Sequence, residues 1–303
     1  MRGLFLALLA GSLVLGLSVL VWLLQPARTP VHLPVGLSSA SPGMVERGAY
    51  MVRAAGCVAC HTDVTRGGKP YAGGRPLETP FGRFHAPNIT PDAETGIGNW
   101  SDADFVRAVM FGEGVNGAHL YPVFPYTSYS RMTLEDVLSI KAYLFSLEPV
   151  RSEARANDIA FPFSWRALMR VWKALHVEVQ RPAEIALGRD ASWVRGRYLV
   201  EGPGHCGECH TPRGLLGAPD RRQSLHGNRE GPEGWYVPAL DGARAAGFAQ
   251  WSVEEIDAYL ETGEKPDFDS AQGPMKEVIM ESTRFLTAED RRAMAVFLKS
   301  LGE

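Results

Sequence analysis

The most conspicuous feature of the hydrophobic pattern is an unbroken apolar run near the start of the chain. Residues 3–24, GLFLALLAGSLVLGLSVLVWLL, contain no charged side chain. As an α-helix this run would be about 33 Å long, which is enough to cross a hydrocarbon core about 30 Å thick. A cleavable signal peptide has a shorter apolar core and a small-residue cleavage site. The sequence QPARTPV that follows has no such site, so we expect residues 1–25 to be an uncleaved anchor, with a removed signal peptide as the alternative.

The flanks of this run predict its orientation. Arg2 is the one charged residue before it, and positive charges remain on the cytoplasmic side of a membrane. Everything after residue 25 is therefore expected outside the cytoplasm. Residues 26–43 are rich in Pro, Ser and Thr and are predicted to be a tether.

Beyond residue 43 the pattern of polar and apolar positions occurs twice. ERGAYMVRAAGCVACHT (46–62) matches VRGRYLVEGPGHCGECHT (194–211), NWSDADFVRAV (99–109) matches QWSVEEIDAYL (250–260), and MTLEDVLSIKAYLFSL (132–147) matches LTAEDRRAMAVFLKSL (286–301). The spacing is also kept, because the first His-to-Trp interval is 39 residues and the second is 41. Two copies of one domain explain this repeat.

The repeat predicts the domain boundaries. We expect a first domain at 44–150 and a second at 191–303, joined by an inter-domain segment at 151–190. That segment contains Phe161, Phe163, Trp165, Met169 and Trp172. It is too aromatic for a flexible linker, so we expect it to pack between the domains, with docking of a partner subunit as a second possibility.

Each copy is predicted to be helical. Four residues of N-cap type have an acidic residue three positions later; they are Ser101, Thr133, Ser252 and Thr287. Ser252 and Glu255 fit the full capping-box pattern. The segments between the cysteine motifs and the tryptophan helices are rich in Gly and Pro and are expected to be loops. No run alternates as a strand would, so the predicted fold class is all-α.

Composition narrows the function only slightly. The chain has 303 residues, 45% of them hydrophobic and 21% charged, and a formal net charge of -3. No basic field indicates nucleic acid, so we expect no nucleic-acid partner. The four cysteines are more informative, because Cys57, Cys60, Cys206 and Cys209 all fall in two Cys-x-x-Cys-His-Thr motifs.

Covalent haem is the chemistry that uses every residue of this motif. The two cysteines form thioethers with a porphyrin, and the histidine that follows binds the iron. A disulfide framework would scatter its cysteines, and a thiol redox site expects a βαβ setting. A zinc site within one copy would lack a fourth ligand. We therefore expect two haem c groups, attached at Cys57 and Cys60 and at Cys206 and Cys209.

These stretches, together with APNITPDAETGIGNWSDADFVRAV and HLYPVFPYTSYSRMTLEDVLSIKAYLFSL, give the chain a resemblance to a known family. It resembles the membrane-anchored dihaem and trihaem cytochrome c subunits of periplasmic alcohol, aldehyde and gluconate dehydrogenases. The resemblance covers most of residues 44–303. It implies two tandem class I cytochrome c domains, His61 and His210 as iron ligands, and a partner subunit that oxidises the substrate. Many relatives carry a third haem domain.

The sixth iron ligand in such proteins is usually a Met thioether. The resemblance favours Met275 for haem 2, ahead of Met280, because the family pattern resembles GPMKEVIMEST with its first Met as ligand. For haem 1, relatives often have Met where this chain has Phe124. Met132 is then the expected ligand. The repeat register, however, pairs Met132 with Leu286.

Other residues have less specific interpretations. His119 and His85 could form a bis-histidine site in place of Met132. Trp100 and Trp251 are expected to pack beside the haems. Asn88 and Arg107 are expected either to reach haem propionates or to lie on a solvated face, and His205 is expected at the surface.

Three functions are compatible with the sequence. The first is an electron-transfer subunit, not itself a catalyst, that relays electrons from a dehydrogenase to a cytochrome, a quinone or a terminal oxidase. The second is an anchored shuttle between a quinol-oxidising complex and a terminal oxidase. The third is a dihaem enzyme such as a peroxidase. In each case the haem domains are expected in the bacterial periplasm, held at the inner membrane by the N-terminal helix.

Overall fold

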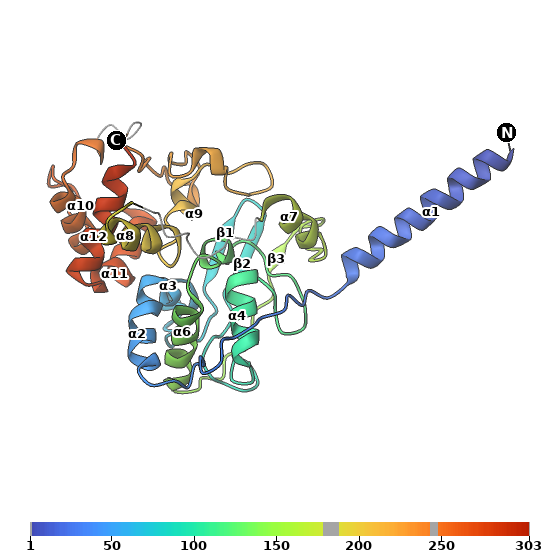
Figure 1. The fold of residues 1–303 in the computed structure, drawn as a ribbon, viewed down its shortest axis with the longest axis horizontal. Helices are drawn as coiled ribbons and strands as arrows, with labels where there is room; N and C mark the ends of the chain where they lie inside the picture. The colour runs from blue at the N-terminus through green and yellow to red at the C-terminus, as the bar shows by residue number, and fades with distance from the viewer. Residues whose placement is uncertain (1, 178–187, 243–247, 303) are drawn as a thin grey trace.

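The computed structural model describes residues 2–177, 188–242 and 248–302. It is mostly helical, with two helical domains and a long N-terminal helix that projects away from them (Figure 1). The α-helices are α1 (Arg2–Leu24), α2 (Met44–Ala54), α3 (Cys57–His61), α4 (Asp102–Phe111), α5 (Tyr126–Tyr129), α6 (Leu134–Ser146), α7 (Leu168–His176), α8 (Ala191–Glu201), α9 (Gly207–His210), α10 (Val253–Thr262), α11 (Gly273–Glu281) and α12 (Ala288–Ser300). Short 3-10 turns are η1 (Val64–Arg66), η2 (Arg221–Gln223), η3 (Pro232–Gly234), η4 (Phe248–Gln250) and η5 (Thr283–Phe285).

The same pair of helices forms the centre of each domain. In the first domain α2 packs along α6, and in the second α8 packs along α12 (Figure 1). The glycine of each Arg-Gly-x-Tyr motif makes these contacts close. A β-carbon on Gly48 would lie 1.9 Å from the carbonyl oxygen of Ser139, and one on Gly196 would lie 1.9 Å from that of Ala293. Any larger residue would force the two helices apart.

The predicted helix starts are confirmed. Each of the four side chains accepts a hydrogen bond from the backbone N–H three residues on: Ser101, Thr133, Ser252 and Thr287. Ser252 and Glu255 form the expected reciprocal capping box. Ser101 forms a second one with Asp104, whose carboxylate accepts from the Ser101 backbone N–H at 3.1 Å.

The expectation of an all-α fold is wrong in one place. A small antiparallel sheet has the strand order β1 (Pro76–Thr79), β2 (Gly82–His85) and β3 (Asp158–Ile159). Strands of two to four residues are too short to show an alternating pattern, and only Phe84 of this sheet is fully buried. The loop expected at this position therefore contains pairing that periodicity could not detect.

The predicted tether does not hang free. Residues 27–41, here called the strap, lie along the first domain. The Ala27 N–H donates to the Gly117 carbonyl at 2.7 Å, and both the N–H and the hydroxyl of Thr29 donate to the Glu113 carboxylate at 2.8 Å. A Pro- and Ser-rich composition indicates no helix or strand, but it does not prevent extended backbone from pairing with a folded surface.

The inter-domain segment contacts both domains, as expected. Residues 178–187 of the predicted span 151–190 lie outside the described residues. In α7, the Trp172 indole donates to the Leu216 carbonyl of the second domain at 2.8 Å. The Lys173 ammonium donates to the carbonyls of Phe111 and Gly112 in the first domain, both at 2.6 Å.

One helix among the described residues is long and apolar enough to cross a membrane. It is α1, whose apolar span Gly3–Leu24 has a mean hydropathy of 2.6 and no buried residue in its most apolar window. A signal sequence would pass the same test, so the structure is compatible with both of the alternatives drawn from the sequence.

Candidate functional site

The two cysteine motifs adopt the same local structure. α3 carries the first motif, and the second begins at Cys206 and continues through α9; the residue before each motif is in the left-handed region. Gly56 has φ 60°, and His205 has φ 37° at the equivalent position. The expectation that His205 lies at the surface is wrong. It is half-buried, and its ring lies edge-on to Tyr129 with the ring centroids 5.6 Å apart.

The histidine of each motif is fixed by a proline carbonyl. His61 Nδ1 lies 2.8 Å from the Pro87 carbonyl oxygen, and His210 Nδ1 lies 2.7 Å from that of Pro238. These contacts require a proton on Nδ1, so the Nε2 lone pair is left for a metal. Burial also lowers the pKa of both imidazoles, which favours the neutral form that binds iron. The residues present therefore fit an iron porphyrin at each motif.

The threonine that ends each motif also has a structural role. The Thr62 hydroxyl accepts from the Tyr71 N–H at 3.1 Å, and the Thr211 hydroxyl accepts from the Leu225 N–H at 3.1 Å. Tyr71 and Leu225 have φ values of 62° and 63°. The two loops that follow the motifs thus turn identically, although their sequences do not match.

The thiols do not resemble a redox or zinc site. The four cysteines form no disulfide. Burial raises the pKa of Cys57 and of Cys206 to about 12, whereas reactive and metal-bound cysteines are stabilised as thiolates. Among the described residues, no group of three or more His, Cys, Asp or Glu side chains could hold a metal ion. Neutral thiols held together on one helical turn are consistent with thioether attachment.

The two methionines predicted near haem 2 lie in different environments. Met275 is half-buried at the start of α11 and packs against the main core. Met280 is 41% exposed, and its sulfur lies 3.3 Å from the Arg284 guanidinium. This difference favours Met275 as an inward-facing residue, and its iron ligation stays a prediction.

Met132 is completely buried at the contact between the domains. Its Cγ lies 3.8 Å from the position of a β-carbon on Gly202 of the second domain. Leu286, its partner in the repeat register, is also buried. Phe124 is half-buried, and its ring centroid lies 5.6 Å from that of Tyr129. Met132 thus has a packing role that Leu286 shares, while its role as iron ligand stays a prediction.

The alternative histidine ligands are placed as follows. His85 lies in β2, and its Nδ1 is 3.0 Å from the Ala156 carbonyl oxygen. Both ring nitrogens of His119 are buried without a hydrogen-bond partner among the described residues. Burial, with the nearby charge of Lys173, lowers the pKa of His119 to about 4.

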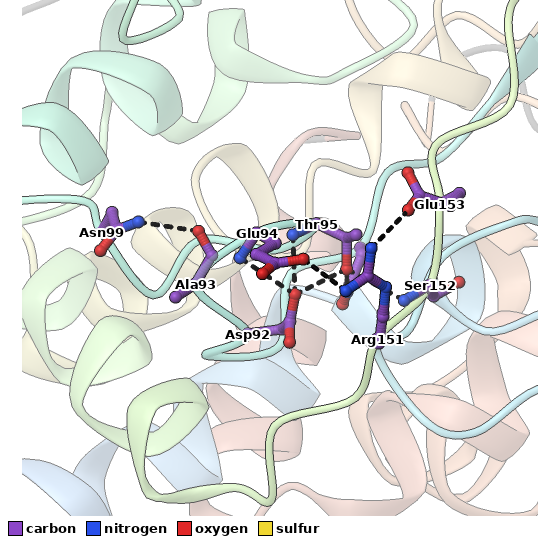
Figure 2. A network of polar contacts seen from close by, with 9 residues as sticks. Asp92, Ala93, Glu94, Thr95, Asn99, Arg151, Ser152 and Glu153 are labelled. Atoms are coloured by element: carbon purple, nitrogen blue, oxygen red, sulfur yellow. Dashed lines mark hydrogen bonds and ion pairs between the residues drawn. The ribbon is translucent and has the colours of Figure 1, made fainter.

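The loop that carries Pro87 is tied to the chain leaving α6 (Figure 2). Asp92 Oδ1 accepts from the N–H of Thr95 at 2.7 Å. The Thr95 hydroxyl in turn accepts from the Ser152 N–H at 2.9 Å. Arg151 pairs with the carboxylates of Glu94 and Glu153 (Figure 2). These contacts fix the backbone that positions the His61 imidazole.

Asn88 and Arg107 are used in this scaffold. The buried Asn88 amide donates to the Val150 carbonyl at 2.7 Å. Arg107 donates to the Asp104 carboxylate at 2.8 Å and to the carbonyl of Thr29 in the strap at 3.1 Å. Trp100 lies against the main core, and the ring centroid of Trp251 is 5.2 Å from that of Tyr259; their packing beside the haems stays a prediction.

The Arg-Gly-x-Tyr repeat links the two domains through a set of polar residues that we call the clamp. The clamp consists of Arg47, Tyr50, Asp136, Arg195, Tyr198 and Asp290. Each arginine pairs with the aspartate of its own domain: Nε of Arg47 lies 2.7 Å from Asp136 Oδ1, and Nε of Arg195 lies 2.8 Å from Asp290 Oδ1.

The tyrosines of the clamp cross between the domains. The Tyr50 hydroxyl donates to Asp290 Oδ2 at 2.5 Å, and the Tyr198 hydroxyl donates to Asp136 Oδ2. Burial, together with the hydrogen bond to Asp290, raises the pKa of Tyr50, which keeps it protonated as a donor. Because both aspartates are buried, the clamp joins the domains through two equivalent, largely water-excluded contacts.

Each cysteine motif also touches the opposite domain. Arg75, which donates to the carbonyl of Ala59 in α3, holds the Glu277 carboxylate of α11 at 2.8 Å. Glu208 of α9 accepts from the hydroxyls of Thr127 and Ser128 in the first domain at 2.7 and 2.8 Å. Both motifs therefore lie at the interface between the domains.

Sequence reasoning missed the carbonyls of Pro87 and Pro238 and the crossing of the clamp. A signal for the prolines is present in the repeat, because they follow the motif histidines by 26 and 28 residues. The clamp residues were visible as repeated Arg-Gly-x-Tyr and Glu-Asp pairs. A repeat does not reveal whether a side chain contacts its own copy or the other one.

Known proteins resemble this chain along most of its length. The profile of the cytochrome c family, described as "Cytochrome c", matches residues 45–148 and 194–302. A "Diheme cytochrome c-type" protein of Cereibacter sphaeroides is 40% identical over 302 residues, covering 98% of this chain and 96% of the relative.

Longer relatives match over part of their length. One of the nicotinate dehydrogenase subunits of Pseudomonas putida is 44% identical over 272 residues, which cover 88% of this chain and 22% of the relative. "Gluconate 2-dehydrogenase cytochrome c subunit" of Pantoea cypripedii is 38% identical over 270 residues, or 87% of this chain and 60% of the relative. The chain thus spans about a fifth and three fifths of these two proteins.

Proposed function

Because the chain belongs to the cytochrome c family and carries two haem c groups, we propose that it relays electrons from a periplasmic dehydrogenase towards the respiratory chain. The family assignment makes it an electron-transfer protein rather than a catalytic subunit. The dehydrogenase partner, the destination of the electrons and the cellular location are the proposed parts.

The observation that carries the proposal is the position of both cysteine motifs at one domain interface. Arg75 connects α3 to Glu277, and Glu208 connects α9 to Thr127. Two redox groups bound there would be neighbours within a single folded unit. The relatives support the choice of partner, since one is a nicotinate dehydrogenase subunit and another a gluconate dehydrogenase cytochrome subunit.

We assign the cofactor contacts as follows. Cys57 and Cys60 attach haem 1, and Cys206 and Cys209 attach haem 2. His61 and His210 bind iron through Nε2, since Nδ1 of each is engaged with a proline carbonyl. Bound haem supplies an iron centre that accepts and releases one electron at a time.

The sixth ligand of each iron is assigned to a methionine. Met275 is the proposed sixth ligand of haem 2. Met132 is the proposed ligand of haem 1, with His119 as the next residue to test. When both axial positions of an iron are filled by protein side chains, no position is open to a substrate. This is the ligation expected of an electron carrier.

We further propose that α1 stays in the bacterial inner membrane, with the haem domains in the periplasm. The apolar span of α1 is long enough for a bilayer, and no residue of its most apolar window is buried within the protein. Haem attachment at Cys-x-x-Cys-His motifs takes place outside the cytoplasm, which agrees with the orientation predicted from Arg2.

Affinity purification of the full-length protein from detergent-solubilised membranes tests this function. The expected result is co-purification of a large dehydrogenase subunit whose substrate reduces the haems. In the control, the tagged haem domains are expressed behind the transmembrane helix of an unrelated anchored protein. This control shows whether a partner is captured only through α1 and the membrane. Co-purification with a quinol-oxidising complex and a terminal oxidase instead would favour the shuttle function.

A further inference from the structure

The strap fixes the body of the protein close to the end of α1. Gln25 and Pro26 alone separate Leu24, the last residue of α1, from Ala27, which is 6% exposed and bonded to Gly117. Three residue steps span at most about 11 Å of extended chain. The surface around Gly117 therefore lies at the boundary of whatever membrane α1 crosses, which a flexible tether would not require.

The α7 helix lies on this same surface. The Arg170 guanidinium sits 4.8 Å from the centroid of the Trp22 ring, and its Nη1 donates to the Gln25 carbonyl at 2.9 Å. These contacts join α7 directly to the end of α1, and Figure 1 shows α7 on the side of the body from which α1 departs.

The outward face of α7 and the segment before it are apolar and exposed. Leu175 near the end of α7 is 67% exposed, whereas Met169 and Trp172 of the same helix are buried. Ahead of the helix, Phe161 is 80% exposed and Trp165 is 41% exposed. Large apolar side chains in such numbers on one segment call for a partner surface.

The composition of the segment indicates which partner it meets. Residues 161–177 contain no acidic residue. Arg166 and Lys173 donate to carbonyls of the first domain, and Arg170 is the basic residue at the end of α1. A helix with Trp, Phe or Leu on one side and basic residues beside them is typical of segments that lie in the headgroup region of a bilayer. Anionic lipid attracts such cations at short range.

We propose that residues 161–175 form a second membrane contact, lying in the headgroup region of the bilayer that α1 spans. The inference rests on the proposed anchoring of α1. The strap brings this segment to the membrane, Phe161, Trp165 and Leu175 enter it, and Arg170 lies at its surface. Contact at two places would hold the haem domains in one orientation on the membrane, which a single flexible anchor could not do.

Photolabelling from within the lipid tests the proposal on the full-length haem-loaded protein. The protein is placed in nanodiscs of phosphatidylethanolamine and phosphatidylglycerol containing a photoactivatable lipid, and labelled peptides are mapped by mass spectrometry. We expect labels in α1 and in residues 161–175. Phe268, which is 97% exposed on the second domain after α10, serves as an internal control and should stay unlabelled.

A variant separates this contact from the anchor. Phe161→Glu combined with Leu175→Glu should lower the labelling of residues 161–175 several-fold and leave that of α1 unchanged. Phe268→Glu is the matched control, and the haem absorption spectrum checks folding. If α1 is labelled but residues 161–175 are labelled no more than Phe268, the second contact alone is overturned. Absence of label from α1 as well would overturn the anchor together with it.

Discussion

Removing the two crossing hydroxyls of the clamp should uncouple the domains. Tyr50→Phe and Tyr198→Phe each delete a hydrogen bond to a buried aspartate of the opposite domain and keep the aromatic ring. Each also deletes a weaker bond of 3.3 Å, accepted from the backbone N–H of Thr287 or of Thr133. The change is conservative in shape. Its effect therefore reports on the polar contact rather than on packing.

The magnitude follows from the type of bond. A hydrogen bond to a charged group contributes about 1.5–3 kcal/mol to the free energy of unfolding. Both aspartates keep an arginine partner in the variants, so no buried charge is left unpaired and the lower half of this range applies to a single change. The Arg195 guanidinium pairs with Asp290 and also lies 5.5 Å from the centroid of the Tyr198 ring, so the two sites are in contact and their effects do not simply add. The double variant should lose more stability than either single change.

Calorimetry of the haem-loaded protein provides the measurement. Each single change should lower the unfolding temperature by about 3–9 °C, at about 2–4 °C per kcal/mol for a body of this size. The double variant should resolve into two transitions, one per domain, where the wild type shows coupled unfolding. Tyr236→Phe is the matched control, because Tyr236 is 69% exposed.

The same contacts predict how the clamp responds to acid. Although burial acts in the opposite sense, hydrogen bonds from Arg195 and Tyr50 hold the pKa of Asp290 below its usual range. A lowered carboxyl pKa adds stability that is present at neutral pH and is lost as the pH falls through the folded-state value.

A double variant as stable as the Tyr236→Phe control at pH 7, with a single transition, would refute the clamp as the link between the domains.

Further predictions concern the haems and a buried histidine. Cys57→Ala should lose haem 1 and retain haem 2, giving half the wild-type haem in a pyridine haemochromogen assay; full loss would mean that the second domain cannot mature alone. Met275→Ala should abolish one low-spin Met-ligated signal and open that iron to carbon monoxide, whereas Met280→Ala should change neither property. Met132→Leu should remove the corresponding signal of haem 1 if its sulfur is the ligand, and an unchanged spectrum and potential would leave Met132 with its packing role alone. Burial lowers the pKa of His119 to about 4 from an ordinary value of 6.5. Protonation of His119 therefore opposes folding, and the free energy of unfolding should fall as the pH drops from 6.5 to about 4. His119→Leu should flatten that part of the pH–stability curve.

The sequence was most informative where local chemistry determines the structure. Side-chain caps such as Ser252 act on backbone groups three residues away, so their pattern predicted helix starts correctly. The cysteine motifs likewise contain all their chemistry within a few residues. The repeat then allowed each observation in one domain to be checked in the other.

Contacts between distant segments could not be predicted in this way. The small sheet pairs Arg83 with Asp158, and the strap pairs Ala27 with Gly117. Such pairing depends on backbone groups, which every sequence supplies, so no side-chain pattern marks it. The left-handed conformation of His205 also follows from its place in the loop rather than from its residue type.

Electron exchange between the two haems tests the central claim most directly. A flash-generated reductant can deliver less than one electron per molecule to the purified, fully oxidised protein, and the absorbance of the two haems is then followed in time. The account predicts a first-order phase of redistribution whose rate does not change when the protein is diluted, because both cysteine motifs lie at one domain interface. Redistribution that slows in proportion to dilution, or that is absent, would contradict an intramolecular relay.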